Sequence, residues 1–202
     1  LLSLALLGLF PLIAKFVVGF IRRRRAYRGF QKPDAFDYNL LVIGGGSAGL
    51  VSAYIGAAVK AKVALIERDR MGGDCLNTGC VPSKALIRSA KAADTLRHAD
   101  RYGLDAVPVS GNFAHIMGRV KRIIAKIEPH DSPERYRGLG VDVIEGSASF
   151  VSPWEVDVTR NDGRRERLSA RSIVIATGGK PFVPPIPGLS TMDPLTSENL
   201  WD

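Results

Sequence analysis

A glycine-rich turn between two short apolar runs constrains the fold of this 202-residue chain more than any other feature. Residues 38–43 predict a buried parallel strand, and residues 62–66 predict a second strand, which ends at Glu67. Between them, Gly44-Gly45-Gly46-Ser47-Ala48-Gly49 leads into an alanine-rich stretch that is compatible with a helix over residues 50–61. This order of strand, glycine turn, helix and strand predicts a Rossmann-like α/β domain with a parallel sheet.

Three glycines of the turn each have a physical role. Gly44 allows the tight turn out of the strand, Gly46 lets a pyrophosphate approach the backbone, and Gly49 allows the helix to pack closely on the sheet. Phosphate oxygens would then meet free amides at the positive end of the helix. The carboxylate of Glu67 would accept hydrogen bonds from ribose hydroxyls. The candidate dinucleotide cradle therefore comprises Gly44, Gly46, Ser47, Ala48, Gly49 and Glu67, and the pattern alone does not distinguish NAD from FAD.

The only two cysteines of the sequence follow the cradle closely. Cys75 and Cys80 are separated by a turn through residues 77–79, which could bring them within the roughly 4.4–6.8 Å between α-carbons that a disulfide needs. Residues 85–99 predict a helix, and Pro82 suits its first turn. Cys80 should therefore lie at or just before a helix N-terminus, where the partial positive charge, together with Lys84, lowers the pKa of a thiol.

Other interpretations of the two cysteines compete with a redox pair. They could form half of a zinc site, remain inert buried thiols, or form a static disulfide that closes a short loop. His98, His115 and His130 are scattered, and there is no second cysteine pair. We therefore predict no metal site.

The N-terminal region predicts a membrane segment. Residues 1–21 are apolar except for Ser3 and Lys15, and as a helix they would span about 31 Å, close to the thickness of a hydrocarbon core. Residues 22–37 then form a basic flank and linker, whose arginines would hold the following domain on the cytoplasmic side of a lipid membrane. A buried hairpin and the end of a larger membrane domain are the alternatives. The net charge of +8 is concentrated in this flank, and no nucleic-acid-binding signature is present.

The second half of the chain alternates between helix and strand patterns. Residues 113–128 show helical spacing of apolar side chains, and residues 141–144, 156–159 and 167–168 read as short strands around a turn. These strands predict a small antiparallel insertion before the last strand, at residues 173–176. We expect one domain over residues 38–202.

These motifs together closely resemble the FAD-dependent pyridine nucleotide–disulfide oxidoreductases, and the run from Gly72 to Lys84 looks most like mercuric reductase-like members. Residues 146–150 resemble the segment whose backbone touches the adenine side of the flavin cofactor. Residues 173–179 resemble the second FAD motif, a strand that ends in Ala-Thr-Gly. Asp74 departs from the Thr or Glu that is common at its position.

The resemblance implies FAD as the bound nucleotide and assigns roles to the pair. Cys80 would be the thiol nearest the flavin, Cys75 the thiol that meets substrate, and Lys84 would lie near the reactive flavin nitrogen. Further expected FAD contacts are Gly73, Asp74, Ala148, Thr177 and Gly178.

The resemblance also implies a reaction. Electrons would pass from NAD(P)H through FAD to a Cys75–Cys80 disulfide and on to a small-molecule disulfide or a soft metal ion. The second nucleotide cradle and the dimerisation domain of such enzymes have no counterpart here, so we expect an incomplete FAD-binding domain, inactive by itself, from a homodimeric protein. The alternatives are a membrane-tethered redox sensor and an NADH dehydrogenase whose cysteines are idle.

Overall fold

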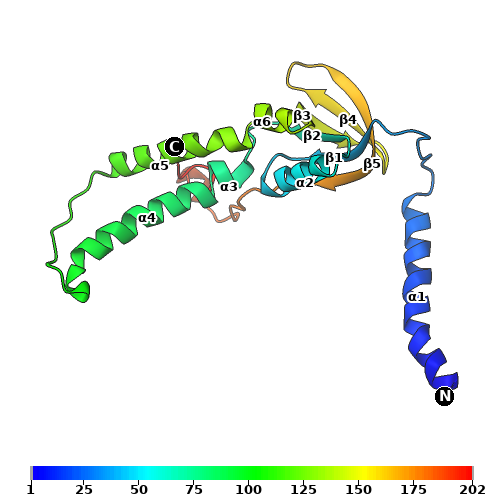
Figure 1. Ribbon diagram of the computed structural model, residues 1–202, viewed down its shortest axis with the longest axis horizontal. Coiled ribbons are helices and arrows are strands. Elements are labelled where there is room, and N and C mark those ends of the chain that lie inside the picture. Colours follow the sequence, from blue (N-terminus) through cyan, green and yellow to red (C-terminus); the bar gives the residue numbers. More distant parts are fainter. Residues whose placement is uncertain (1, 202) are drawn as a thin grey trace.

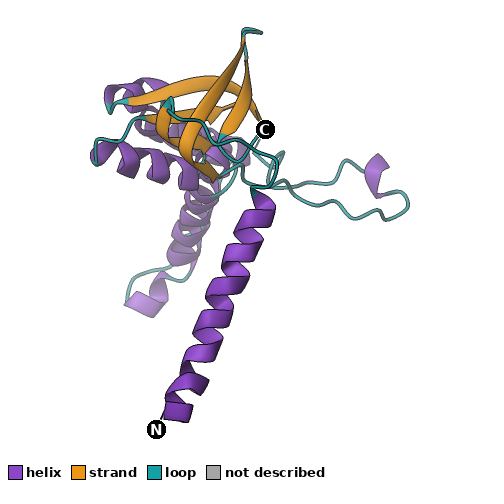
Figure 2. Ribbon diagram, turned by 90° about the vertical axis from the view of Figure 1, so that its right-hand side faces the viewer, coloured by secondary structure: helices purple, strands orange, loops and turns teal. Residues whose placement is uncertain are grey.

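The computed structural model describes residues 2–201 and shows a sheet domain with a helical hairpin and one separate N-terminal helix (Figures 1 and 2). Three short 3₁₀ turns, at residues 99–102, 128–131 and 189–191, accompany the regular elements. In chain order, these elements are α1 (Leu2–Ala26), β1 (Tyr38–Ile43), α2 (Ser47–Ala58), β2 (Val63–Glu67), α3 (Gly73–Asn77), α4 (Cys80–Arg97), α5 (Phe113–Ile127), α6 (Pro133–Gly138), β3 (Val141–Phe150), β4 (Glu155–Arg160) and β5 (Arg165–Ile175).

The strands form two sheets that share β3 and β5. In the parallel sheet, β1 lies between β5 and β2, with Val42 opposite Val174 on one side and Leu65 on the other. β3 continues this sheet beyond β2. The distal parts of β3 and β5 pair antiparallel with β4, so the five strands close into a ring. The predicted Rossmann-like parallel sheet with an antiparallel insertion is therefore present.

The strands of the insertion are longer than the sequence indicates. Residues 167–168 and 173–176 were expected as separate short strands, whereas β5 runs without a break from Arg165 to Ile175. Likewise, β3 continues beyond residue 144 into the antiparallel sheet. Gly146 lies where β3 changes partners, and a Cβ atom there would come within 2.4 Å of the Thr159 carbonyl oxygen. The missing side chain lets β4 approach closely, which allows one strand to serve both sheets.

Both faces of the parallel sheet are buried. Val42, Leu65 and Val143 belong to a cluster that includes residues of α2. Leu41, Ile66 and Val158 belong to a second cluster, on the side of the antiparallel strands β3, β4 and β5, which we call the meander. Because alternate residues of each strand point to opposite faces, burial on both sides explains the continuous apolar runs in the sequence.

The helices of the middle region form a hairpin. Figure 1 shows α4 and α5 projecting together from the sheet domain. Arg119 of α5 joins them, because its Nη1 donates to the Ala85 carbonyl oxygen at 2.8 Å and to Ser89 Oγ at 3.2 Å. α5 agrees with the helix expected at residues 113–128, and α4 begins at Cys80, earlier than the predicted start at residue 85. α3 and α6 were not predicted.

The N-terminal helix extends beyond the predicted segment. α1 continues to Ala26, through the arginines that we had placed in a flank, and stands apart from the sheet domain (Figure 2). The side chains of residues 1–10 and 12, on which much of the membrane prediction rests, lie outside the described part of the chain. In the part that is described, no helix has the length and apolar character needed to cross a membrane.

Two contacts attach the linker to the sheet domain. The Tyr27 and Trp154 rings stack with centroids 5.0 Å apart. Asp37 accepts hydrogen bonds from the Ser169 backbone N–H and hydroxyl, at 2.8 and 2.7 Å, and these bonds lower the pKa of its carboxyl. The linker is therefore held against β5 and the turn before β4.

The close approach of α2 to β1 gives a stability prediction. A Cβ atom on Gly49 would lie 1.8 Å from the Gly44 carbonyl oxygen, whereas a Cβ on Gly111 would meet nothing within 4 Å. We expect Gly49→Ala to lower the free energy of unfolding by about 1–3 kcal/mol, as overpacking does, and Gly111→Ala to leave it nearly unchanged. Urea denaturation of both variants measures the difference. Equal stability of the two variants would contradict the role that we assign to Gly49.

Candidate cofactor cavity and redox pair

A cavity of about 910 Å³ opens where β1, β2 and β5 end. Open α/β sheets bind ligands outside the carboxyl ends of their strands, so the position is the expected one. The volume is also within the usual range for small-molecule and cofactor sites. Eleven of the predicted site residues line it: Gly44, Gly46, Ser47, Ala48, Glu67, Gly73, Asp74, Cys75, Ala148, Thr177 and Gly178.

The glycine turn forms one wall of the cavity. Gly44 has a φ of +105° and would place a Cβ 2.3 Å from the Ala176 carbonyl oxygen, so only glycine fits. Gly46 is the N-cap of α2 and provides no side-chain cap. The first amides of α2 thus lie at the cavity without a capping side chain, which suits an anionic group such as a pyrophosphate.

Glu67 has a structural function that the sequence did not reveal. Its Oε2 accepts a hydrogen bond from the Gly45 N–H at 2.5 Å, and its Oε1 accepts one from the Asp69 N–H at 2.8 Å. The carboxylate therefore fixes the glycine turn to the end of β2. It also lines the cavity, as a ribose-binding residue would.

The redox segment is built onto the glycine turn through its backbone. Gly46 and Gly72 form a parallel bridge, and the Gly72 N–H donates to the Gly45 carbonyl oxygen at 2.9 Å. A Cβ atom on Gly73 would lie 2.7 Å from the Gly46 α-carbon. The glycines on both sides of this contact allow α3 to lie directly against the cradle.

The two thiols lie on consecutive helices. Cys75 is half-buried in α3 and lines the cavity, whereas Cys80 is exposed and is the first residue of α4, as expected. The connecting turn is tight: the Thr78 N–H donates to the Asp74 carbonyl oxygen at 2.9 Å, and a Cβ atom on Gly79 would lie 2.8 Å from that oxygen. Both thiols are free in this structure.

The electrostatics of Cys80 correct one expectation. We expected the helix terminus and Lys84 to lower the pKa of this thiol, but the pKa is raised. The largest cause is hydrogen bonding with the Cys75 thiol, followed by its charge, and the charge of Lys84 only partly offsets both. The neighbouring sulfur therefore has more influence on the pKa of Cys80 than the charge of Lys84 does.

Three predicted residues lie outside the cavity lining. Gly49, Cys80 and Lys84 are absent from it, and Gly49 acts instead in helix packing. Conversely, the lining includes residues that sequence reasoning did not name. Several directly follow a strand, and that position could have identified them. The principal additions are Arg68, Asp69 and Arg70 after β2, and Gly179 and Lys180 after β5.

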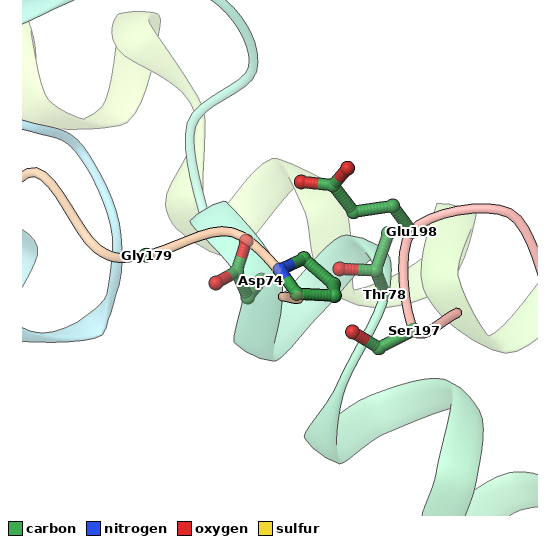
Figure 3. A pocket seen from close by; sticks show the side chains of 6 residues that line it. Asp74, Thr78, Gly179, Ser197 and Glu198 are labelled. Atoms are coloured by element: carbon green, nitrogen blue, oxygen red, sulfur yellow. The ribbon is translucent and has the colours of Figure 1, made fainter. Parts of the chain in front are cut away.

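A smaller cavity of about 250 Å³ adjoins the first. Asp74, Thr78, Gly179 and Glu198 line both cavities, and Pro181 and Ser197 complete the smaller one. Figure 3 shows Asp74 and Thr78 of the redox segment facing Ser197 and Glu198 of the last segment of the chain. Within the described residues, no group of three or more His, Cys, Asp or Glu side chains is arranged to hold a metal ion.

The pKa of Cys80 can be tested by removing its neighbour. Since Cys75 is the main cause of the raised pKa, Cys75→Ala should lower it, and Lys84→Met should raise it further. The pH dependence of Cys80 alkylation, which follows the thiolate, measures both changes. If Cys75→Ala leaves the midpoint of the pH profile unchanged, the two thiols do not interact in solution as they do in this structure.

Comparison with known proteins identifies the domain. Residues 38–201 match the family model described as pyridine nucleotide-disulphide oxidoreductase. The chain is 33% identical over 163 residues to dihydrolipoyl dehydrogenase of Bacillus subtilis (strain 168), which covers 77% of this chain and 34% of that protein. It is 33% identical over 167 residues to mercuric reductase of Bacillus cereus, covering 83% of this chain and 26% of that protein.

A solved structure of a related protein has a similar fold. The HOCl-induced flavoprotein disulfide reductase from Escherichia coli, determined as the Cu(II) complex of a mutant, matches with a TM-score of 0.63 and 28% identity, over 78% of this chain and 32% of that one. The chain thus spans roughly a third or less of these relatives. Members of the family depend on FAD and use NAD(P)H, in agreement with the cofactors expected from the sequence. The strand–glycine turn–helix cradle, the paired thiols and these matches lead to one conclusion: the chain belongs to the pyridine nucleotide-disulphide oxidoreductase family.

Proposed function

We propose that the full-length protein is an FAD-dependent NAD(P)H oxidoreductase that passes electrons to the Cys75–Cys80 pair and on to a disulfide or soft-metal substrate. One observation carries this proposal: Cys75 lines the same cavity as the glycine cradle and Glu67. A nucleotide in that cavity would lie against the Cys75 thiol, which is near enough to Cys80 to raise the pKa of that second thiol.

The cavity residues fit FAD. The amides of Ser47 and Ala48 at the start of α2 would meet the pyrophosphate, and Glu67 would meet the ribose hydroxyls. Ala148 of β3 and Thr177, which follows β5, would contact the remainder of the cofactor. Bound FAD would supply the two-electron exchange between NAD(P)H and the sulfur pair.

The thiols would perform the exchange with substrate. In the dithiol form, a Cys75 thiolate attacks one sulfur of a substrate disulfide, forms a mixed disulfide and releases the other sulfur as a thiolate. Cys80 then attacks the Cys75 sulfur and releases the second substrate thiol. The protein pair loses two electrons and two protons, which the substrate gains as two thiols. The exposure of Cys80 and the half-buried position of Cys75 leave both accessible.

Cys80→Ser in the full-length protein tests this function. Disulfide reduction should fall by about a hundredfold or more, because the second attack is lost. Thr95→Ala, on the same helix and outside the cavity, is the control and should retain activity. The assay follows NAD(P)H consumption with a panel of disulfides and mercuric ion.

The alternatives predict other results when the assay also includes a quinone and a variant in which both cysteines are replaced. A redox sensor would show no turnover even in the unmodified protein. An NADH dehydrogenase with idle cysteines would keep its quinone reduction when both cysteines are replaced. Either result would overturn the proposal.

We also propose that the full-length protein is anchored to a membrane and forms a homodimer. Phe16 of α1 is 76% exposed, Ile13 and Phe20 are each 53% exposed, and α1 stands apart from the sheet domain (Figure 1). Arg22, Arg24 and Arg25 follow and are exposed too. An apolar helix that ends in arginines supports anchoring to a lipid membrane with the flavin domain on the cytoplasmic side. Family membership supports the homodimer.

Cell fractionation tests the anchoring. The full-length protein should sediment with membranes and resist extraction by alkaline carbonate, whereas a variant lacking residues 1–26 should appear in the supernatant. Replacing Arg22, Arg24 and Arg25 by glutamine should leave the protein membrane-bound, but a fraction of the molecules should then have the flavin domain on the opposite side of the membrane. Complete release of the unmodified protein by carbonate would contradict anchoring through α1.

A further inference from the structure

The last segment of the chain makes a direct contact with the turn between the two thiols. Trp201 Nε1 donates a hydrogen bond to the Thr78 carbonyl oxygen at 2.7 Å, across 123 residues of sequence. The same N–H is shared with the Ser197 carbonyl oxygen at 3.1 Å, one turn back in its own segment. Thr78 lies between Cys75 and Cys80, so the indole N–H bonds to the backbone that joins the two redox residues.

The segment that presents Trp201 is fixed by its own hydrogen bonds. Asn199 Oδ1 accepts from the Thr196 N–H at 2.6 Å, and Asn199 Nδ2 donates to the Pro194 carbonyl oxygen at 3.3 Å. The Leu200 N–H donates to the Thr196 carbonyl oxygen at 3.1 Å. The indole therefore projects from a preformed turn, so that little conformational entropy is lost when it bonds to Thr78.

The Thr78–Gly79 peptide unit controls the geometry of the pair. Thr78 is the C-cap of α3, and Gly79, with φ −126° and ψ −104°, is the N-cap of α4. The rotation of this peptide plane sets the direction of Cys80 relative to Cys75. Its carbonyl oxygen is held by Trp201, and the preceding peptide unit is held by the bond from the Thr78 N–H to the Asp74 carbonyl oxygen.

We propose that Trp201 is a positioning residue for the redox pair, whose N–H bond to Thr78 holds the inter-cysteine turn in the conformation that allows the two sulfurs to join. A turn with a fixed carbonyl keeps the sulfurs near each other, which favours the disulfide over the dithiol. Without this bond, the turn samples more conformations and closure of the disulfide costs more entropy. The inference rests on the redox function proposed for the pair.

The test is the thiol–disulfide equilibrium of the full-length protein in glutathione buffers, measured by trapping free thiols with an alkylating agent. In this equilibrium, oxidised glutathione takes two electrons and two protons from Cys75 and Cys80 and becomes two thiols. Trp201→Phe keeps an aromatic ring and removes the donor. It should shift the equilibrium toward the dithiol by about fivefold, the effect of one ordinary hydrogen bond. Trp154→Phe, in the stack with Tyr27 on the meander, is the matched control and should not shift it.

An equilibrium constant for Trp201→Phe equal to that of the unmodified protein would overturn the inference. If this variant fails to fold, Asn199→Ala provides the second test, because it loosens the segment that presents the indole without altering the inter-cysteine turn. An unchanged constant in that variant likewise overturns the inference. Failure of the proposed function would look different, because it would appear as a lack of disulfide turnover in the unmodified protein, whereas the thiol–disulfide equilibrium is measured without turnover.

Discussion

The contact between α2 and β1 at Gly44 and Gly49 determines where every other part of the site lies. The missing side chain at Gly49 brings the helix onto the carbonyl of Gly44, and Gly56, whose Cβ would lie 2.9 Å from a Val63 methyl carbon, keeps the far end of α2 equally close to the sheet. Buried Ala53 and Ala57 fill the same interface with small side chains. A helix that lies so near the sheet directs its N-terminal amides at the point where β1 and β2 end.

The cradle and the thiols are parts of one backbone unit. The bridge between Gly46 and Gly72 and the bond from the Gly72 N–H to the Gly45 carbonyl oxygen, at 2.9 Å, link the glycine turn to α3. A displacement of the glycine turn would therefore move Cys75 with it. This coupling explains why the cofactor motif and the cysteine motif are separated by so few residues: the distance between nucleotide and sulfur is fixed by covalent structure and two short contacts.

The sequence predicted the parts of the fold that depend on local patterns. The apolar runs of β1 and β2, the glycines, and the helix that begins near Cys80 follow from periodicity and from the conformational freedom of glycine. It did not predict that β3 and β5 each serve two sheets, because the change of partner at Gly146 depends on the approach of β4. Nor could it reveal that Glu67 fixes the glycine turn or that Trp201 reaches Thr78, since both bonds join segments brought together only by the fold. The raised pKa of Cys80 was missed because the helix terminus was considered without the neighbouring thiol.

The ring of five strands has a consequence for the tendency of the partly folded domain to aggregate. Each described strand has two hydrogen-bonded neighbours, but β3 and β5 bond to only one of them at each residue, so the free rows of amides and carbonyls that they leave are short. Open edges are the usual starting points for aggregation of partly folded α/β proteins. A sheet whose two outer strands change partner along their length thus offers a second molecule only short edges.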